Sequence, residues 1–216
     1  MLIDLKLDGK TVLIVGGGKV GERKAENSLE ERAKVVIASR DFTPRLKKMG
    51  ETGRVKLVEL DVEKNLPKLR RVMAQSSVVF AACDDRCLNE AVVGEAKKLG
   101  VLVCAVDNPS VSDFITPAVA RVGDFRIAVS TRGKSPAMAR ILRKRVEETI
   151  TPEDLLQVKL QNHVRTRLKG MSLGEDSKRR LLYRIIRDKT VKQLLRRRRL
   201  GEAKKRAEEV IKTLRP

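Results

Sequence analysis

Aromatic residues are the scarcest feature of this 216-residue chain. It has no tryptophan, and aromatic side chains make up 2% of the sequence. The formal net charge of +20 indicates an anionic partner. The classes that fit are nucleic acid, an acidic membrane surface, and a phosphate or polycarboxylate ligand. Proteins that bind single strands usually stack bases on aromatic rings. The shortage of rings therefore argues against nucleic acid as the partner.

Cysteine and histidine are also scarce. Cys83, Cys87 and Cys104 are too few for a disulfide framework, and Cys83 and Cys87 lack the further ligands of a closed zinc site. The single histidine, His163, is expected to be a surface or packing residue. We therefore expect free thiols and no resident metal.

Long apolar runs are absent as well. No run approaches the roughly 20 residues of a membrane span, and the first residues lack the layout of a signal peptide. The sequence therefore predicts a cytoplasmic protein that does not use a membrane.

A glycine-rich turn is the clearest motif present. The apolar run 11–15 is followed by Gly16, Gly18 and Gly21 in G-x-G-x-x-G order, and a helical segment begins at Lys19. In this motif the glycines allow a tight turn, a close approach of backbone to pyrophosphate, and close packing of helix on strand. The helix N-terminus offers N–H groups to phosphate. We expect a dinucleotide site that includes these residues and Val20.

The second apolar strand, 35–38, ends in Ser39-Arg40-Asp41. An acidic residue at this place binds the ribose hydroxyls of NAD, whereas an arginine accommodates the 2′-phosphate of NADP. Asp41 favours the first and Arg40 the second, so the sequence leaves the choice open. Asp84, which follows the apolar segment 77–82, is a further expected cofactor contact.

Strands and helices alternate as far as residue 106. The strands at 11–15, 35–38, 55–58, 77–82 and 101–106 are apolar throughout, as in a parallel sheet covered on both faces. The alternation predicts a doubly wound, Rossmann-type α/β domain. Residues 125–130 alternate and favour an antiparallel strand, and 136–149 favour a helix.

The pattern changes again near residue 150. Residues 151–216 predict three or four helices and no strand. They contain 20 lysines and arginines against 8 aspartates and glutamates, so this segment has a charge of +12. We expect a basic helical region there.

Four further stretches follow the glycine turn, which itself extends from Val15 to Ala25. They are Ala81-Ala82-Cys83-Asp84-Asp85, Val106-Asp107-Asn108-Pro109, Asp113-Phe114-Ile115-Thr116-Pro117-Ala118 and Ala128-Val129-Ser130-Thr131-Arg132-Gly133-Lys134-Ser135-Pro136. In these stretches, and in their order and spacing, the sequence resembles the precorrin-2 dehydrogenases of the sirohaem pathway. The resemblance covers residues 1 to about 150.

The resemblance implies an NAD-binding domain over 1–110, a dimerisation region over 111–150 and a helical region over 151–216. It implies a homodimer that oxidises precorrin-2 to sirohydrochlorin and passes hydride to NAD. The family's key aspartate falls on Asp107, which follows the fifth strand. Asp107 is then the expected general base, and the alternative from the residues alone is an aspartate that closes the Asn-Pro turn.

The substrate implied by the resemblance has eight carboxylates, and basic residues are expected to bind them. The basic candidates are Arg132, Lys134 and Arg140, and Asn108 and Thr131 are further expected contacts of the substrate. Other readings stay open from the sequence: an enzyme that also inserts iron or cobalt, an NAD-sensing module without turnover, and a nucleic-acid binder that uses the basic helices.

Overall fold

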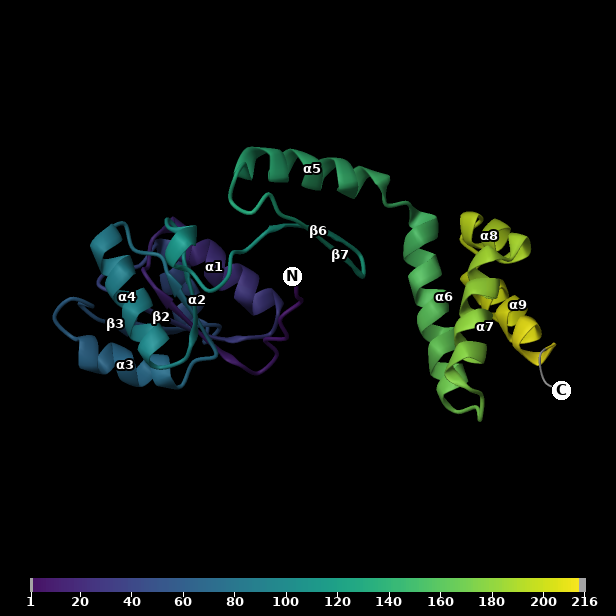
Figure 1. Cartoon of the computed structure of the whole chain (residues 1–216), viewed down its shortest axis with the longest axis horizontal. Coiled ribbons are helices and arrows are strands. Elements are labelled where there is room, and N and C mark those ends of the chain that lie inside the picture. Colours follow the sequence, from purple (N-terminus) through teal and green to yellow (C-terminus); the bar gives the residue numbers. More distant parts are fainter. Residues whose placement is uncertain (1, 214–216) are drawn as a thin grey trace. The chain divides into compact units, whose positions relative to one another are not determined.

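The computed structural model describes residues 2–213. The chain divides into two compact units, Met1–Thr116 and Pro117–Pro216. Figure 1 shows an α/β unit followed by a hairpin and a series of helices.

Five parallel strands form the sheet of the first unit, in the spatial order β3-β2-β1-β4-β5. Their bounds are Thr11–Val15 (β1), Lys34–Ser39 (β2), Lys56–Glu59 (β3), Val78–Ala81 (β4) and Leu102–Ala105 (β5). The chain moves outward from β1 to β3 and then returns to place β4 on the other side of β1. The connections therefore diverge between β1 and β4, and their carboxyl ends flank the point where doubly wound sheets bind ligands.

Helices cover both faces of this sheet: α1 (Lys19–Glu30), α2 (Pro44–Glu51), α3 (Leu66–Ala74) and α4 (Arg86–Lys98). Side chains of successive strand residues point to opposite faces. Leu13 and Val15 of β1 belong to the core that α3 and α4 cover. Val12 and Ile14 belong to the core that α1 and α2 cover. This explains why the central strands are apolar throughout.

Side-chain caps fix where two of these helices begin. The Thr43 hydroxyl accepts a hydrogen bond from the Leu46 N–H at 3.2 Å, and Pro44 occupies the first turn of α2. Asp85 does the same for α4, accepting from the Leu88 N–H at 3.0 Å. Such caps satisfy N–H groups that have no partner within the helix.

An antiparallel hairpin opens the second unit. Strands β6 (Ala118–Val122) and β7 (Phe125–Val129) are joined by Gly123-Asp124, with Gly123 at a φ of +56°. Helix α5 (Pro136–Thr149) packs against both strands. Its first turn is capped by Ser135, whose hydroxyl accepts from the Met138 N–H.

Four helices complete the described part of this unit: α6 (Pro152–Lys169), α7 (Glu175–Arg187), α8 (Lys189–Arg196) and α9 (Leu200–Lys212). They enclose an apolar core of their own that includes Leu160, Val164, Ile185 and Leu195. Thr151 and Asp154 form a reciprocal capping box at the start of α6. Within residues 2–213, no helix combines the length and apolarity that a membrane crossing requires.

The expected fold class is confirmed, with the five-stranded parallel sheet, the hairpin and the helical C-terminal region all present. The strand at 118–122 was not expected from the sequence. The finer division at residues 110 and 150, with dimerisation assigned to the middle part, stays a prediction.

Candidate active site

A pocket of about 510 Å³ lies at the carboxyl edge of the sheet, beside the ends of β1, β2 and β4. It is the place that the strand order favours for a ligand. Its lining comes from four loops and includes Gly16, Gly17, Gly18, Ala38, Ser39, Arg40, Asp41, Phe42, Thr43, Leu60, Asp61, Val62, Glu63, Ala82, Cys83, Asp84, Asp85 and Leu88.

Three glycines of the turn are required by the protein's own packing. A Cβ on Gly16 would lie 2.2 Å from the Ala82 carbonyl oxygen, and Gly16 also has a φ of +120°. A Cβ on Gly17 would lie 2.0 Å from the Asp41 carbonyl oxygen, and one on Gly21 would lie 2.1 Å from the Gly16 carbonyl oxygen. The loops that follow β1, β2 and β4 therefore touch through glycine backbone.

Gly18 differs from these three. It is exposed, its φ is −80°, and among residues 2–213 no atom beyond its two chain neighbours lies within 4 Å of where its Cβ would be. Gly18 is also the N-cap of α1, whose N-terminus receives no side-chain hydrogen bond. An open glycine before an uncapped helix N-terminus suits the approach of a phosphate group.

The loop after β2 is held against the glycine turn. The Thr43 N–H donates to the Gly17 carbonyl at 3.0 Å, and the Thr43 hydroxyl donates to Glu22 of α1 at 2.5 Å. These bonds fix the segment that carries Arg40 and Asp41. Both of those side chains are exposed and line the pocket.

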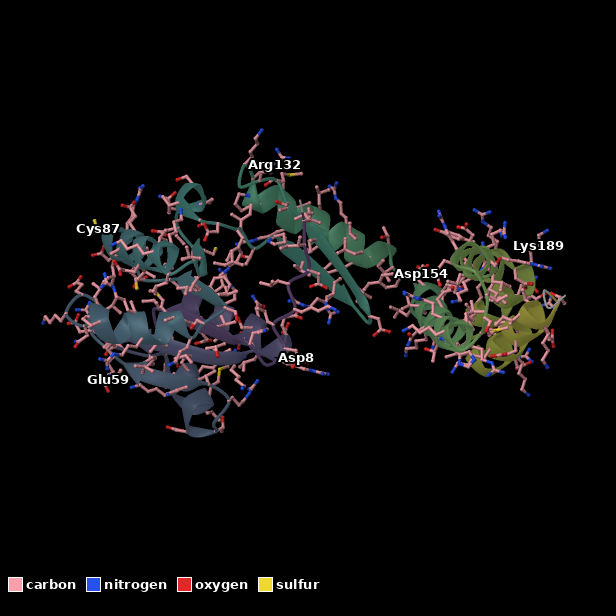
Figure 2. The ribbon with its side chains drawn as sticks, turned by 60° about the horizontal axis from the view of Figure 1, so that its bottom comes forward. Asp8, Glu59, Cys87, Arg132, Asp154 and Lys189 are labelled. Carbon is pink, nitrogen blue, oxygen red and sulfur yellow. The ribbon has the colours of Figure 1, made fainter. Side chains whose placement is uncertain are left out.

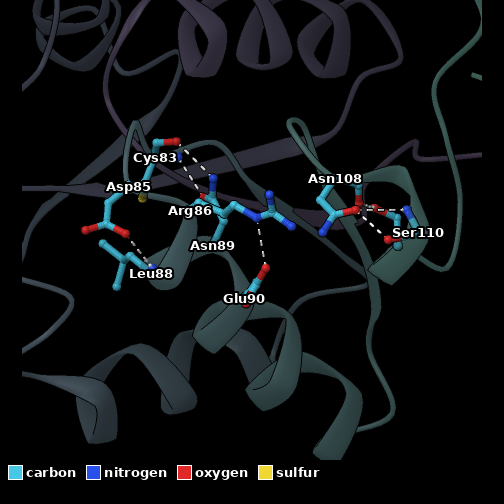
Figure 3. Close-up of polar contacts among 9 residues, drawn as sticks. Cys83, Asp85, Arg86, Leu88, Asn89, Glu90, Asn108 and Ser110 are labelled. Carbon is cyan, nitrogen blue, oxygen red and sulfur yellow. Dashed lines mark hydrogen bonds and ion pairs between the residues drawn. The ribbon is translucent and has the colours of Figure 1, made fainter.

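The loop after β4 is held by Asn89, which is buried. Its amide oxygen accepts from the Cys83 N–H and its amide nitrogen donates to the Cys83 carbonyl, both at 2.9 Å (Figure 3). The Cys83 thiol contacts the Val15 carbonyl at 3.5 Å and joins this loop to the end of β1.

The Cys83 thiol is not prepared for nucleophilic chemistry. Its pKa is raised to about 11, mainly by burial and also by the carboxylates of Asp84, Asp85 and Asp107, while Arg40 opposes the rise. The thiol therefore stays protonated at neutral pH. Because the Asp107 carboxylate contributes to this raised pKa, it acts electrostatically on Cys83, which is a residue of the pocket wall.

Asp107 and Asn108 follow β5 and have different local roles. The Asn108 side-chain oxygen accepts from the Ser110 N–H at 3.2 Å and from the Ser110 hydroxyl at 2.6 Å, which caps the short 3₁₀ turn 109–111 (Figure 3). Asp107 is exposed, and within residues 2–213 its carboxylate accepts no hydrogen bond. The turn is thus closed by Asn108, which leaves the carboxylate of Asp107 available.

Three of the expected substrate residues belong to the second unit, in the turn between β7 and α5. The Thr131 hydroxyl accepts from the Ser135 N–H at 2.9 Å. Arg132 is an exposed arginine with a φ of +53°, and Figure 2 labels it at this turn. Lys134 is exposed too. Positive φ in a non-glycine residue is a strained state that is common at functional sites.

The pocket brings together part of the expected cofactor set: Gly16, Gly18, Arg40, Asp41 and Asp84. Lys19, Val20 and Gly21 form the first turn of α1 directly after the lining glycines. Asp107 and Asn108 are not lining residues of this pocket.

The sequence analysis missed the wall made by residues 60–63, which includes Asp61 and Glu63. These residues directly follow β3, and the carboxyl-end rule for parallel strands would have found them. Among the described residues, no group of three or more His, Cys, Asp or Glu side chains is placed to hold a metal ion.

The fold and the pocket define a doubly wound nucleotide-binding protein. A family model described as "Putative NAD(P)-binding" matches residues 3–118. A second model, described as "Sirohaem biosynthesis protein central", matches residues 123–149. The first matches more than half of the chain, and together they cover the sheet unit, β7 and the whole of α5, while residues 119–122 of β6 lie between the two matches.

Relatives and a solved structure agree with these models. The chain is 32% identical over 188 residues to a precorrin-2 dehydrogenase of Methanosarcina barkeri, which covers 87% of this chain and 83% of the relative. It is 39% identical over 151 residues to a sirohaem synthase of Gluconobacter oxydans, covering 70% of this chain and 31% of that longer protein.

The solved structure of SirC, a precorrin-2 dehydrogenase, shares the fold with a TM-score of 0.73 at 19% identity, and the match covers 97% of this chain and 99% of that one. The chain belongs to the family of precorrin-2 dehydrogenases and sirohaem synthase N-terminal regions. The resemblance seen in the sequence is thereby confirmed.

Proposed function

We propose that this protein is an NAD-dependent precorrin-2 dehydrogenase that produces sirohydrochlorin for tetrapyrrole biosynthesis. The main support is its similarity to the Methanosarcina barkeri enzyme over most of both chains. The reaction removes two electrons and two protons from the substrate. NAD, when bound, accepts one hydrogen as hydride, and the other must leave as a proton to a base.

The pocket fits a dinucleotide on its own geometry. Beside Gly18 there is space that no other described residue fills, and the uncapped N-terminus of α1 begins there. These groups would hold the pyrophosphate. Lys19, Val20 and Gly21 belong to the same first helical turn, and Asp84 would contact the cofactor from the loop after β4.

The charge of the lining favours NAD over NADP. Five carboxylates, those of Asp41, Asp61, Glu63, Asp84 and Asp85, face one guanidinium, that of Arg40. An additional 2′-phosphate would be repelled by this excess of negative charge. Asp41 at the end of β2 is the residue that would bind the ribose hydroxyls.

Asp107 is the residue that we assign as general base. Its carboxylate accepts no hydrogen bond within the described residues and contributes to the electrostatics of Cys83 on the pocket wall. The competing role, closure of the turn, is taken by Asn108. An exposed and unbonded carboxylate is free to take the proton from the substrate and pass it to water.

Substrate carboxylates require cations. Arg132 and Lys134 in the turn before α5, with Thr131 and Asn108, are the contacts that we propose for these carboxylates within residues 1–150.

We also propose a homodimer and a cytoplasmic location, as the resemblance and the composition predict. For the dimer, α5 exposes Met138, Ile141 and Leu142, which lie on one face at helical spacing.

The test is an anaerobic incubation of the full chain with precorrin-2 and NAD, followed by absorbance. Equal formation of sirohydrochlorin and NADH is expected. If NAD binds and no product forms, the protein is a nucleotide sensor and the proposal is wrong. Addition of ferrous iron or cobalt to the same reaction measures metal insertion separately.

The matched variants are Asp107→Asn and Asp113→Asn. The first keeps the size of the side chain and removes the base, and we expect kcat to fall about 10²- to 10⁴-fold with NAD affinity unchanged. Asp113 instead accepts a hydrogen bond from the Val103 N–H at 3.0 Å, so its variant should lower stability more than kcat. An unchanged kcat in Asp107→Asn would end the assignment of the base.

A further inference from the structure

One face of α7 carries an unusual concentration of arginine. A shallow hollow of about 970 Å³ lies on this helix, separate from the pocket of the first unit. Four arginines and the only tyrosine of the chain are among its lining residues, which are Asp176, Arg179, Arg180, Tyr183, Arg184, Arg187 and Asp188. We call this surface the α7 arginine face.

Some arginines elsewhere in the second unit pair with carboxylates. The pairs include Arg143–Glu147 at 2.5 Å, Arg196–Glu153 at 2.8 Å, Arg206–Glu209 at 3.0 Å and Arg199–Glu202, while others such as Arg165 and Arg197 have no carboxylate within 4 Å among residues 2–213. What distinguishes the α7 arginine face is that Arg179, Arg184 and Arg187, which also have no carboxylate within 4 Å among the described residues, line one hollow together. Figure 2 shows side chains tipped with nitrogen all around these C-terminal helices.

The two acidic residues of the hollow do not balance this charge. Asp188 caps α8 by accepting from the Val191 N–H at 2.9 Å, and it already pairs with Arg206 at 3.2 Å. Asp176 lies in the first turn of α7, where a carboxylate interacts with the helix dipole. The face therefore keeps a net positive charge.

The charges on this face have opposing effects on the stability of α7. Arg184 and Arg187 lie in its last turn, where cations interact favourably with the helix dipole. Arg180 and Arg184 are four residues apart, and Arg184 and Arg187 are three apart, so like charges are neighbours on the helix surface. The opposite face of α7 supplies Leu181 and Ile185 to the core. The helix is thus held by its apolar face while its outer face carries unpaired cations, which suits a surface that binds an anion.

We infer that the α7 arginine face binds the carboxylate groups of the tetrapyrrole substrate, an inference that rests on the proposed function. Guanidinium groups pair with carboxylates through two parallel hydrogen bonds. The Tyr183 ring is half exposed, with the Arg187 guanidinium 5.8 Å from its centroid, and it offers a flat surface to a macrocycle. The pocket of the first unit, with five carboxylates against one arginine, has the wrong charge for such a ligand.

The experiment measures binding without turnover. The probe is uroporphyrin, a stable fluorescent tetrapyrrole with eight carboxylates, and the readout is its emission anisotropy on titration with the full chain. The test variant is Arg184→Ala/Arg187→Ala, for which we expect at least tenfold weaker binding. The control is Arg165→Ala/Arg197→Ala, which removes the same charge from exposed positions outside the hollow and should change the dissociation constant less than twofold.

Two further measurements exclude other causes. The melting temperature of the α7 variant should stay close to that of the wild type, because relief of the like-charge repulsion offsets the loss of two cations from the last turn of α7 and the core residues are untouched. Coproporphyrin, with four carboxylates, should bind more weakly than uroporphyrin and should depend less on salt.

Loss of uroporphyrin binding in both double variants, or in neither, would overturn the inference. A short RNA that binds the wild type more tightly than uroporphyrin, and that loses affinity only in the α7 variant, would assign the face to nucleic acid instead. The anisotropy measurement does not depend on catalysis. A protein without dehydrogenase activity that still binds uroporphyrin through this face would therefore contradict the proposed function and support this inference.

Discussion

Gly18 is the residue at which protein packing and ligand binding can be told apart. Gly16, Gly17 and Gly21 are required by close backbone contacts, whereas a methyl group on Gly18 would meet no other residue in the described part of the chain. Any effect of such a methyl group on nucleotide binding is therefore direct. This makes Gly18 the most informative position of the glycine turn.

Gly18→Ala is expected to weaken NAD binding about tenfold or more, because the methyl group occupies the space where the pyrophosphate approaches the backbone. The loss of stability should be only about 0.5–1 kcal/mol, the usual cost of alanine at an N-cap. Isothermal titration with NAD and thermal unfolding measure the two quantities.

The control for this variant is Gly174→Ala. Gly174 is also an N-cap with open space around it, at the start of α7. It should show the same small loss of stability and no change in NAD affinity. Equal effects of both substitutions on NAD binding would contradict the assignment of Gly18 to the pyrophosphate.

Asp41 and Arg40 allow a second test at the residue scale. Asp41→Ala should weaken NAD binding about tenfold, because hydrogen bonds to a charged group are worth about 1.5–3 kcal/mol, and it should leave NADP binding unchanged or improved. Arg40→Ala should change NAD affinity little. Fluorescence titration with both reduced nucleotides gives the ratio, and a wild-type preference for NADP would show that Arg40 governs the choice.

At the scale of elements, Lys24 connects α1 to the segment that follows β5. It is 8% exposed, its ammonium donates to the Thr116 hydroxyl at 2.7 Å, and it lies 4.8 Å from the centroid of the Phe80 ring. Phe80 in turn meets Phe114 edge to face at 5.7 Å. Burial lowers the pKa of Lys24, and the nearby thiol of Cys104 opposes that shift.

Lys24→Met is expected to raise the free energy of unfolding at pH 7 by about 1 kcal/mol, because an apolar side chain of similar length avoids the burial of a charge. The folded-state pKa lies below 10.5, so the unfolded chain binds the proton more strongly. Wild-type stability, compared with the variant, should therefore rise as the pH increases from neutral towards 10.5.

Urea unfolding of both proteins at pH 7 and pH 10 measures this difference. The gain from methionine should shrink at the higher pH. A gain that is constant across this range, or a variant that is less stable at pH 7, would show that the bond to Thr116 outweighs the cost of burying the ammonium.

The elements of the first unit could be predicted because each has a local physical signal. Buried parallel strands are apolar throughout, and Thr43 and Asp85 stand just before helices that they cap. Strand β6 was missed, although Gly123-Asp124 between two short apolar segments is a known hairpin signal. Its five residues include only one fully buried side chain, that of Ala120, so no strong apolar pattern marked it.

The candidate site was predictable in part for the same reason. The glycine turn and the end of β2 carry recognisable motifs. The loop at 60–63 carries none, and it lines the pocket because β3 lies next to β2 in the sheet. The sequence could not show whether Asp107 or Asn108 closes the turn, because both residue types can do so and only the geometry shows that Asn108 does.

At the scale of the whole molecule, α5 carries an apolar face that the described residues leave exposed. Met138 and Ile141 are each 44% exposed and Leu142 is 37% exposed, at positions i, i+3 and i+4 of one helix. The other side of α5 packs on the hairpin β6–β7. Burial of this face in a second copy would remove apolar area from water in both copies at once, as a twofold dimer requires.

Ile141→Glu should therefore convert a dimer into a monomer at micromolar concentration, because each interface would contain two buried charges without partners. Sedimentation equilibrium of the full chain measures the mass directly. Lys144→Gln changes the net charge by the same amount on the same helix, at an exposed position outside the apolar face, and should remain dimeric. A wild-type monomer, or an Ile141→Glu variant that stays dimeric, would mean that this face is covered in some other way.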